Sequence, residues 1–183
     1  DGIKRDRLVW VGDMHPETLT IRTVFGADAS VARSLEFIRK ETPLPGWMNG
    51  MASYTMWYAI IVHDWFMYTG DLEWLRSQEE YLEGISRQLS ECIDEKGKDT
   101  VTEGRFLDWP SSDRPGVVDA GVQAIHLLAA DSLRKLFMAL GKQGPAEECA
   151  RDMERLACFP ADAGGSKQAA ALLVLAGLRD AEE

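Results

Sequence analysis

Hydrophobic positions recur with a helical period along most of the chain, in two different patterns. In the first pattern, apolar residues occupy nearly every side of the helix, as they do in residues 54–68, 117–140 and 168–178. A helix that is apolar all round must be buried all round. In the second pattern, apolar residues form one stripe, as they do in residues 72–93, 146–157 and, more weakly, 30–40. Striped helices cover buried ones on their outer side, so the sequence predicts an inner and an outer helical layer.

Short joints connect each inner helix to the outer helix that follows it. Residues 68–71 and 140–145 carry Gly to end one helix, and Asp71 or Pro145 to start the next. A short joint makes the two helices antiparallel neighbours. The unit of loop, inner helix, turn and outer helix recurs at 16–40, 53–93 and 117–157, and a fourth inner helix begins near Lys167.

Repeated hairpins in two layers predict an all-α fold, specifically an α/α toroid of helical hairpins. Six hairpins would close such a ring, and this chain carries about three and a half. We therefore expect residues 1–183 to form a single partial domain, about half of the toroid, with the remainder of the barrel beyond the chain. An open solenoid of hairpins is the competing architecture, although it usually shows more regular repeats and shorter joints.

Charge and composition exclude several function classes. The net charge of −10 argues against nucleic acid as a partner and against docking on an anionic membrane. The longest apolar run, 54–68, is interrupted by His63 and Asp64 and is too short to span a bilayer. The three cysteines have no zinc spacing, and neither a metal-ligand cluster nor a Gly-rich phosphate loop occurs. We therefore expect no metal and no cofactor.

The predicted topology brings distant loops to one end of the molecule. All inner helices run in the same sense, so the long loops that precede them gather there, and loops on a rigid scaffold carry function. The chemical groups expected to converge are Asp1, Asp6, Asp13, Trp47, Asp108 and Trp109. Trp57, on an inner helix, could reach the same pocket, although core packing is its simpler interpretation. His63 and His126 are expected to be core histidines with hydrogen-bonding partners.

Carboxylates beside tryptophans favour a carbohydrate ligand. Sugar rings pack their C–H faces on aromatic rings, and carboxylates hold pairs of hydroxyls. Glycoside hydrolysis also needs one carboxylic acid and, in an inverting enzyme, a second carboxylate about 6.5–9.5 Å away. The simpler alternatives are a solvated charged terminus for residues 1–13, and loop residues covering the core for Trp47 and Trp109.

The opening stretch resembles a known signature. Residues 1–13, DGIKRDRLVWVGD, resemble the motif of glycoside hydrolase family 78, the α-L-rhamnosidases, and the match consists of Asp1, Arg5, Asp6, Arg7, Trp10, Gly12 and Asp13. Residues 68–71 and 107–110 resemble the family's later Thr-Gly-Asp and Gly-Asp-Trp stretches. The family's catalytic domain is an (α/α)6 barrel of the six-hairpin glycosidase type, in agreement with the hairpins above.

The resemblance implies an inverting, metal-independent hydrolysis of terminal α-L-rhamnose. The family's general acid is a Glu inside the opening motif, and Asp6 falls nearest to its place. Carried over, Asp1 and Asp13 would bind L-rhamnose, with Arg5 and Trp10 beside them. The usual Glu is absent here, and Gly2-Ile3 replaces the family's Cys-Pro. The general base lies beyond residue 183, so we expect residues 1–183 alone to be inactive.

Other functions stay open on the sequence alone. Another exo-glycosidase or a lyase on the same toroid would share these features. A catalytically inactive carbohydrate-binding toroid would use Asp6 only for binding, and a helical scaffold for protein partners would bind no sugar. The family resemblance alone favours a periplasmic or extracellular location and accessory β-domains in the same protein.

Overall fold

The computed structural model describes residues 9–180, and within them the fold is all-α. Its α-helices are α2 (Val11–Phe25), α3 (Ala29–Glu41), α4 (Ala52–Thr69), α5 (Leu72–Ser90), α6 (Pro115–Leu140), α7 (Gln143–Ala157) and α8 (Lys167–Leu175). Two short 3-10 turns, η1 (Met48–Gly50) and η2 (Trp109–Ser111), precede α4 and α6. Asp1, Arg5 and Asp6 lie outside the described residues.

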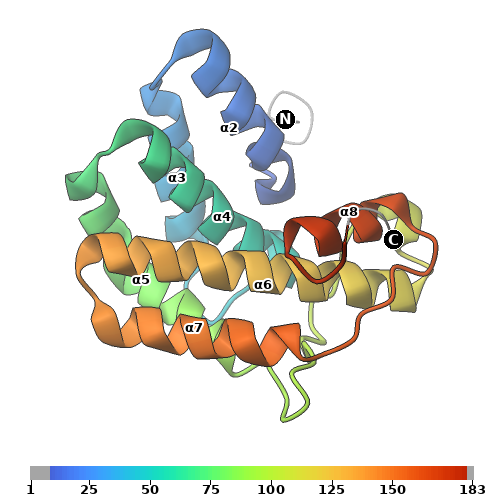
Figure 1. The fold of residues 1–183 in the computed structure, drawn as a ribbon. Helices are drawn as coiled ribbons and strands as arrows, with labels where there is room; N and C mark the ends of the chain where they lie inside the picture. Colours follow the sequence, from blue (N-terminus) through green and yellow to red (C-terminus); the bar gives the residue numbers. More distant parts are fainter. Residues whose placement is uncertain (1–8, 181–183) are drawn as a thin grey trace.

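The predicted all-α fold is confirmed for the described residues. The inner helices pack against one another in chain order, α2 on α4, α4 on α6 and α6 on α8. The outer helix α7 lies on α6 and also contacts α5. Figure 1 shows α4 and α6 running in the same sense, with their N-terminal ends toward the same end of the molecule, and α8 packs against α6.

Burial separates the two kinds of helix. α6 buries residues on every side, from Val117 to Phe137, whereas α5 buries a single stripe that includes Leu75, Leu82 and Leu89. Left-handed glycines Gly70 and Gly141 end α4 and α6, and each leads directly into the following outer helix. The carboxylate of Asp71 accepts a hydrogen bond from the amide of Trp74 and caps α5, as predicted.

Two predicted helix starts are wrong: residue 16 for the first helical unit, and Pro145 for the helix after the second short joint. α2 begins at Val11 and contains Pro16, because the carbonyl of Trp10 already accepts the amides of Asp13 and Met14 one turn earlier. α7 similarly begins at Gln143, two residues before Pro145.

Two further observations bear on the sequence predictions. Within residues 9–180, no helix is both long enough and apolar enough to cross a membrane. Cys92, Cys149 and Cys158 are all free thiols, and Cys149 is buried between α5 and α7.

Candidate functional site: the rim at the inner-helix N-termini

A row of aromatic rings runs across the starts of three segments. The ring of Tyr54, in the first turn of α4, lies edge-on to Phe106 with centroids 6.1 Å apart. Phe106 in turn meets Trp109 of η2, with centroids 5.1 Å apart. Trp109 is 80% exposed, so its indole faces solvent instead of covering the core. We call Tyr54, Phe106 and Trp109 the aromatic row.

The aromatic row begins beside the start of α2. The ring of Tyr54 lies over Gly12, so close that a Cβ on Gly12 would stand 2.4 Å from its Cε1 atom. Burial and the nearby charge of Asp13 raise the pKa of the Tyr54 phenol, which therefore stays protonated at neutral pH and can donate a hydrogen bond. Asp13 itself is exposed. Gly12 and Asp13 thus lie beside Tyr54, an aromatic residue about 40 positions away in the chain.

Asn49 ties the start of α2 to the loop before α4. Its side-chain oxygen accepts the amide of Val11 at 3.0 Å, and its side-chain nitrogen donates to the carbonyl of Val9 at 3.0 Å. The backbone of Asn49 is left-handed, with φ of 51°, a conformation that Asn adopts more readily than most residues. This side chain replaces the missing side-chain cap of α2.

A backbone contact joins the loops before α4 and α6. The amide of Ala52 donates to the carbonyl of Gly104 at 3.0 Å. A Cβ on Gly104 would stand 2.1 Å from the carbonyl oxygen of Gly50, so only glycine allows this approach. The contact places Phe106 and Trp109 next to the start of α4.

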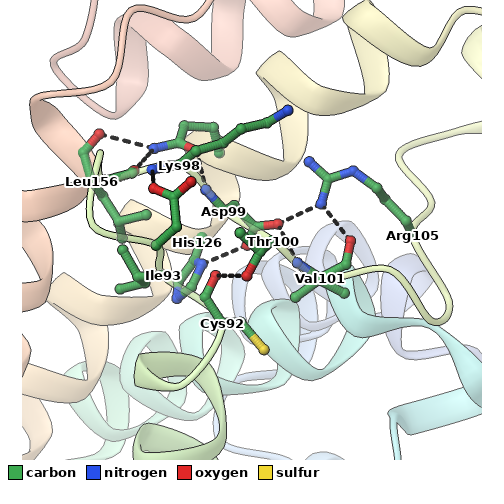
Figure 2. Close-up of polar contacts among 12 residues, drawn as sticks. Cys92, Ile93, Lys98, Asp99, Thr100, Val101, Arg105, His126 and Leu156 are labelled. Carbon is green, nitrogen blue, oxygen red and sulfur yellow. Dashed lines mark hydrogen bonds and ion pairs between the residues drawn. The ribbon is translucent and has the colours of Figure 1, made fainter.

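A buried ionic network lies beneath the loop that carries Phe106 and Trp109 (Figure 2). Asp99 is its centre: one carboxylate oxygen lies 2.6 Å from His126 Nδ1, and the other accepts from the Arg105 guanidinium. The Arg105 guanidinium also donates to Asp119 Oδ1 at 2.8 Å and to the carbonyl of Val101. Gln123 accepts the amide of Asp99 at 2.8 Å. The network therefore fastens residues 97–105 to α6.

Electrostatics keep this network charged. Burial opposes ionisation of Asp99, but hydrogen bonds and charge from His126 and Arg105 outweigh it and hold the pKa of Asp99 below its ordinary value. Burial likewise opposes the charge of Arg105, and the two carboxylates that it contacts outweigh burial and raise its pKa. Asp99 and His126 are almost wholly buried, so this cluster stabilises the packing of residues 97–105 on α6.

A second polar cluster joins α2 to α4 and begins one helical turn further along both helices than the Gly12–Tyr54 contact. The ring of His15 stacks on Trp57 with centroids 4.8 Å apart, and its Nε2 lies 3.4 Å from the carboxylate of Asp64. His63 Nδ1 lies 3.0 Å from the same carboxylate. Burial would raise the pKa of Asp64, but the two histidines outweigh burial and hold it well below its usual range.

The structure places the predicted residues in different surroundings. Asp13 and Trp109 lie at the two ends of the aromatic row, whereas Trp57 contacts His15 on α2.

Trp47 is half-buried and lines a cavity with Phe37 and Ile38 of α3. The Asp108 carboxylate accepts the amide and hydroxyl of Ser111 and so caps η2. Trp10 is half-buried at the start of α2.

Sequence reasoning missed several residues that build the rim. Tyr54 was assigned to a fully buried helix, and Phe106, Asn49 and Arg105 were not singled out. A signal for the buried network did exist. Gln123 and His126 are polar residues inside a helix that is apolar all round, so each needs a buried partner. His126 is a buried histidine with a hydrogen-bonding partner, as predicted, and His63 is bonded but only partly buried.

In the part of the chain that the structure describes, no group of three or more His, Cys, Asp or Glu side chains could hold a metal ion. The chain matches no protein-family model, no curated protein and no solved structure.

Proposed function

We propose that this chain is part of the catalytic toroid of a glycoside hydrolase similar to the inverting α-L-rhamnosidases. It would act on terminal α-L-rhamnose in glycosides or polysaccharides. The observation that carries the proposal is the aromatic row, with the exposed Trp109 at one end and Asp13 of the opening motif at the other. Flat apolar rings next to a carboxylate and a neutral phenol suit a sugar, which offers C–H faces and hydroxyl groups together.

Each residue has a role in this proposal. Asp13 accepts hydroxyls of the sugar, and Trp109 packs on its C–H face. Asp6 donates a proton to the glycosidic oxygen, and a base carboxylate elsewhere in the ring, about 6.5–9.5 Å away, takes a proton from the attacking water. Asp1, Arg5 and Trp10 line the pocket, and Asp108 acts indirectly by shaping the turn that presents Trp109.

The arrangement of the helices supports a toroid as the setting. Inner helices that contact one another in chain order and share one sense are the geometry expected of part of a closed α/α ring. In this proposal, residues 1–183 supply about half of the ring, and the rest of the barrel and accessory β-domains belong to the same protein. A polysaccharide substrate would place the protein outside the cytoplasm.

A binding-only toroid is the second candidate. It is favoured by one feature, the presence of Asp6 where the similar family has Glu, because Asp is one methylene shorter and must reach within about 2.6–3.2 Å of the oxygen it protonates. Both candidates require sugar binding at the aromatic row, and they differ only in turnover.

Binding can be tested on this chain directly. In a ¹⁵N–¹H spectrum of residues 1–183 titrated with methyl α-L-rhamnoside, the indole N–H of Trp109 should shift saturably. The indole N–H of Trp74, on the outer helix α5, should stay in place as the internal control. A Trp109→Ala variant should lose the saturable shifts of the backbone amides of Tyr54 and Phe106, the other two residues of the aromatic row. Equal shifts at both indoles, or none at Trp109, would refute the sugar site at the aromatic row.

A further inference from the structure

A cavity distinct from the aromatic row opens at the same end of the molecule as Trp109, beside the loop that follows α7. It has a volume of about 400 Å³ and lies between the start of α6 and the loop before α8. Small-molecule sites range from roughly 300 to 1,000 Å³, so this cavity is large enough for a ligand of the size of a single sugar. Its walls include Arg114, Val117, Asp119, Phe159, Asp162 and Gly164.

The carboxylate of Asp119 forms a fixed polar group in this cavity. Its Oδ1 accepts from Arg105 Nε at 2.8 Å, and its Oδ2 lies 3.2 Å from Lys98 Nζ. Arg105 also pairs with the buried Asp99, so the network around Asp99 fixes the position of the Asp119 carboxylate. The side chain of Asp119 is still 37% exposed, which leaves acceptor capacity free toward the cavity.

Another part of the wall consists of the Phe159 ring and of the loop before α8, which is held against the start of α6. Phe159 is half-buried, and Lys98 Nζ lies 5.8 Å from its ring centroid. The Arg114 guanidinium donates to the carbonyl of Gly164 and so bridges from the start of α6 to the loop. The backbone of Gly164 is left-handed, and a Cβ there would stand 3.2 Å from Val117, so the loop lies close against α6.

We infer that this cavity, which we call the α6–α8 pocket, is a second binding site for a neutral sugar ring. Carboxylates at Asp119 and Asp162 accept hydroxyl protons, the Arg114 guanidinium supplies a donor, and Phe159 supplies an apolar surface. Asp119 is already paired with Arg105 and Lys98, and Arg114 lies in the same wall, so the pocket combines acceptors with donors, as a neutral ring with several hydroxyls requires. The choice of a sugar as the ligand class rests on the proposed function, because a polysaccharide would span both rim sites.

The α6–α8 pocket can be tested separately from the aromatic row in one experiment. Methyl α-L-rhamnoside added to ¹⁵N-labelled residues 1–183 should shift the backbone amides of Gly116 and Gly164 saturably. Phe159→Ala should weaken this binding at least tenfold, whereas Phe159→Tyr should retain it. Trp109→Ala, which alters only the aromatic row, should leave the Gly116 and Gly164 titration unchanged. Glycerol, a polyol without a ring face, should give no saturable shift.

The possible outcomes separate the two sites. Shifts at Trp109 without shifts at Gly164 would overturn the α6–α8 pocket as a sugar site and leave the proposed function standing. Saturable shifts at Gly164 without shifts at Trp109 would support the pocket and count against the aromatic row. An unchanged affinity in Phe159→Ala, or an equal response to glycerol, would also overturn the inference. Asp162→Asn offers a second variant, since Asp162 is exposed and its loss leaves the core intact. Because Asp162 Oδ1 accepts the amide of Gly164 at 2.9 Å, binding to this variant is read from Gly116.

Discussion

The ring of Tyr54 occupies the space beside Gly12 that any other residue would fill with a side chain. The distance from the position of a Cβ on Gly12 to Tyr54 Cε1 is 2.4 Å, well inside van der Waals contact. This contact connects the opening motif to the aromatic row. It also gives a physical reason for glycine at this position, independent of any family resemblance.

Gly12→Ala should displace Tyr54 and disturb the aromatic row. Overpacking at such a contact costs roughly 1–3 kcal/mol, so the free energy of unfolding in urea should fall by that amount. Gly144→Ala is the matched control, because Gly144 lies near the start of α7 and a Cβ there meets nothing within 4 Å. The control should gain about 0.5–1 kcal/mol from the better helix propensity of Ala. Equal effects of the two substitutions would contradict the Tyr54 contact.

Asn49→Ala should destabilise the start of α2 in two ways. It removes the hydrogen bonds to Val9 and Val11, at about 0.5–2 kcal/mol for a lost cap, and it places Ala in a left-handed conformation. Asn49→Gly removes the same hydrogen bonds but tolerates the backbone, so it should be less destabilising than Asn49→Ala. Amide hydrogen exchange in α2 would report both effects. If the two variants were equally stable, the backbone argument would be wrong.

Asp99→Asn should be strongly destabilising at neutral pH. It removes the buried carboxylate that pairs with Arg105 and contacts His126, and breaking a buried ion pair by removing one partner typically costs about 3–5 kcal/mol. Asp131→Asn on α6 is the control: Asp131 also contacts two cations, but at a partly exposed site, and its loss should cost about 1 kcal/mol or less. Urea unfolding of the two variants beside the wild type would measure the difference.

The same network predicts how stability depends on pH. The pKa of Asp99 is lower in the folded state than its unfolded value of about 3.9. Its contribution is therefore fully present above that pH and is lost as pH falls through the lower, folded pKa. The stability difference between wild type and Asp99→Asn should accordingly shrink in acid. A difference that grew as the pH fell would show that Asp99 is not held ionised.

Asp64→Asn should loosen α2 from α4 without disturbing the aromatic row. The Asp64 carboxylate contacts both His15 and His63, and a partly exposed polar contact of this kind contributes about 1 kcal/mol, or roughly a fivefold change in an equilibrium. Amide exchange in α2 should rise by about that factor, while exchange in α7 stays unchanged. Uniform acceleration across both helices would mean that the contact stabilises the whole fold and not this junction.

Sequence periodicity predicted most of the helical framework but not the rim. The stripe of Val31, Leu35 and Ile38 in α3 is buried as expected, because local amphipathic spacing fixes which face a helix buries. The start of α2 was misplaced because its cap comes from Asn49, a residue remote in sequence. Gln123 and His126 indicate that buried polar partners exist, but long-range pairing between a loop and α6 leaves no local pattern that identifies Asp99 and Arg105 as part of that network.

Turnover in the longer protein to which we assign this chain tests the central claim most directly. Release of chromophore from an aryl α-L-rhamnoside should be measured for the wild type and for Asp6→Asn side by side. We predict cleavage by the wild type and a loss of at least about 10²-fold in the variant, the lower end for general acid catalysis. Full activity in Asp6→Asn would assign the acid to another residue. No cleavage of any aryl glycoside by the wild type would contradict the proposal that this rim belongs to a glycosidase.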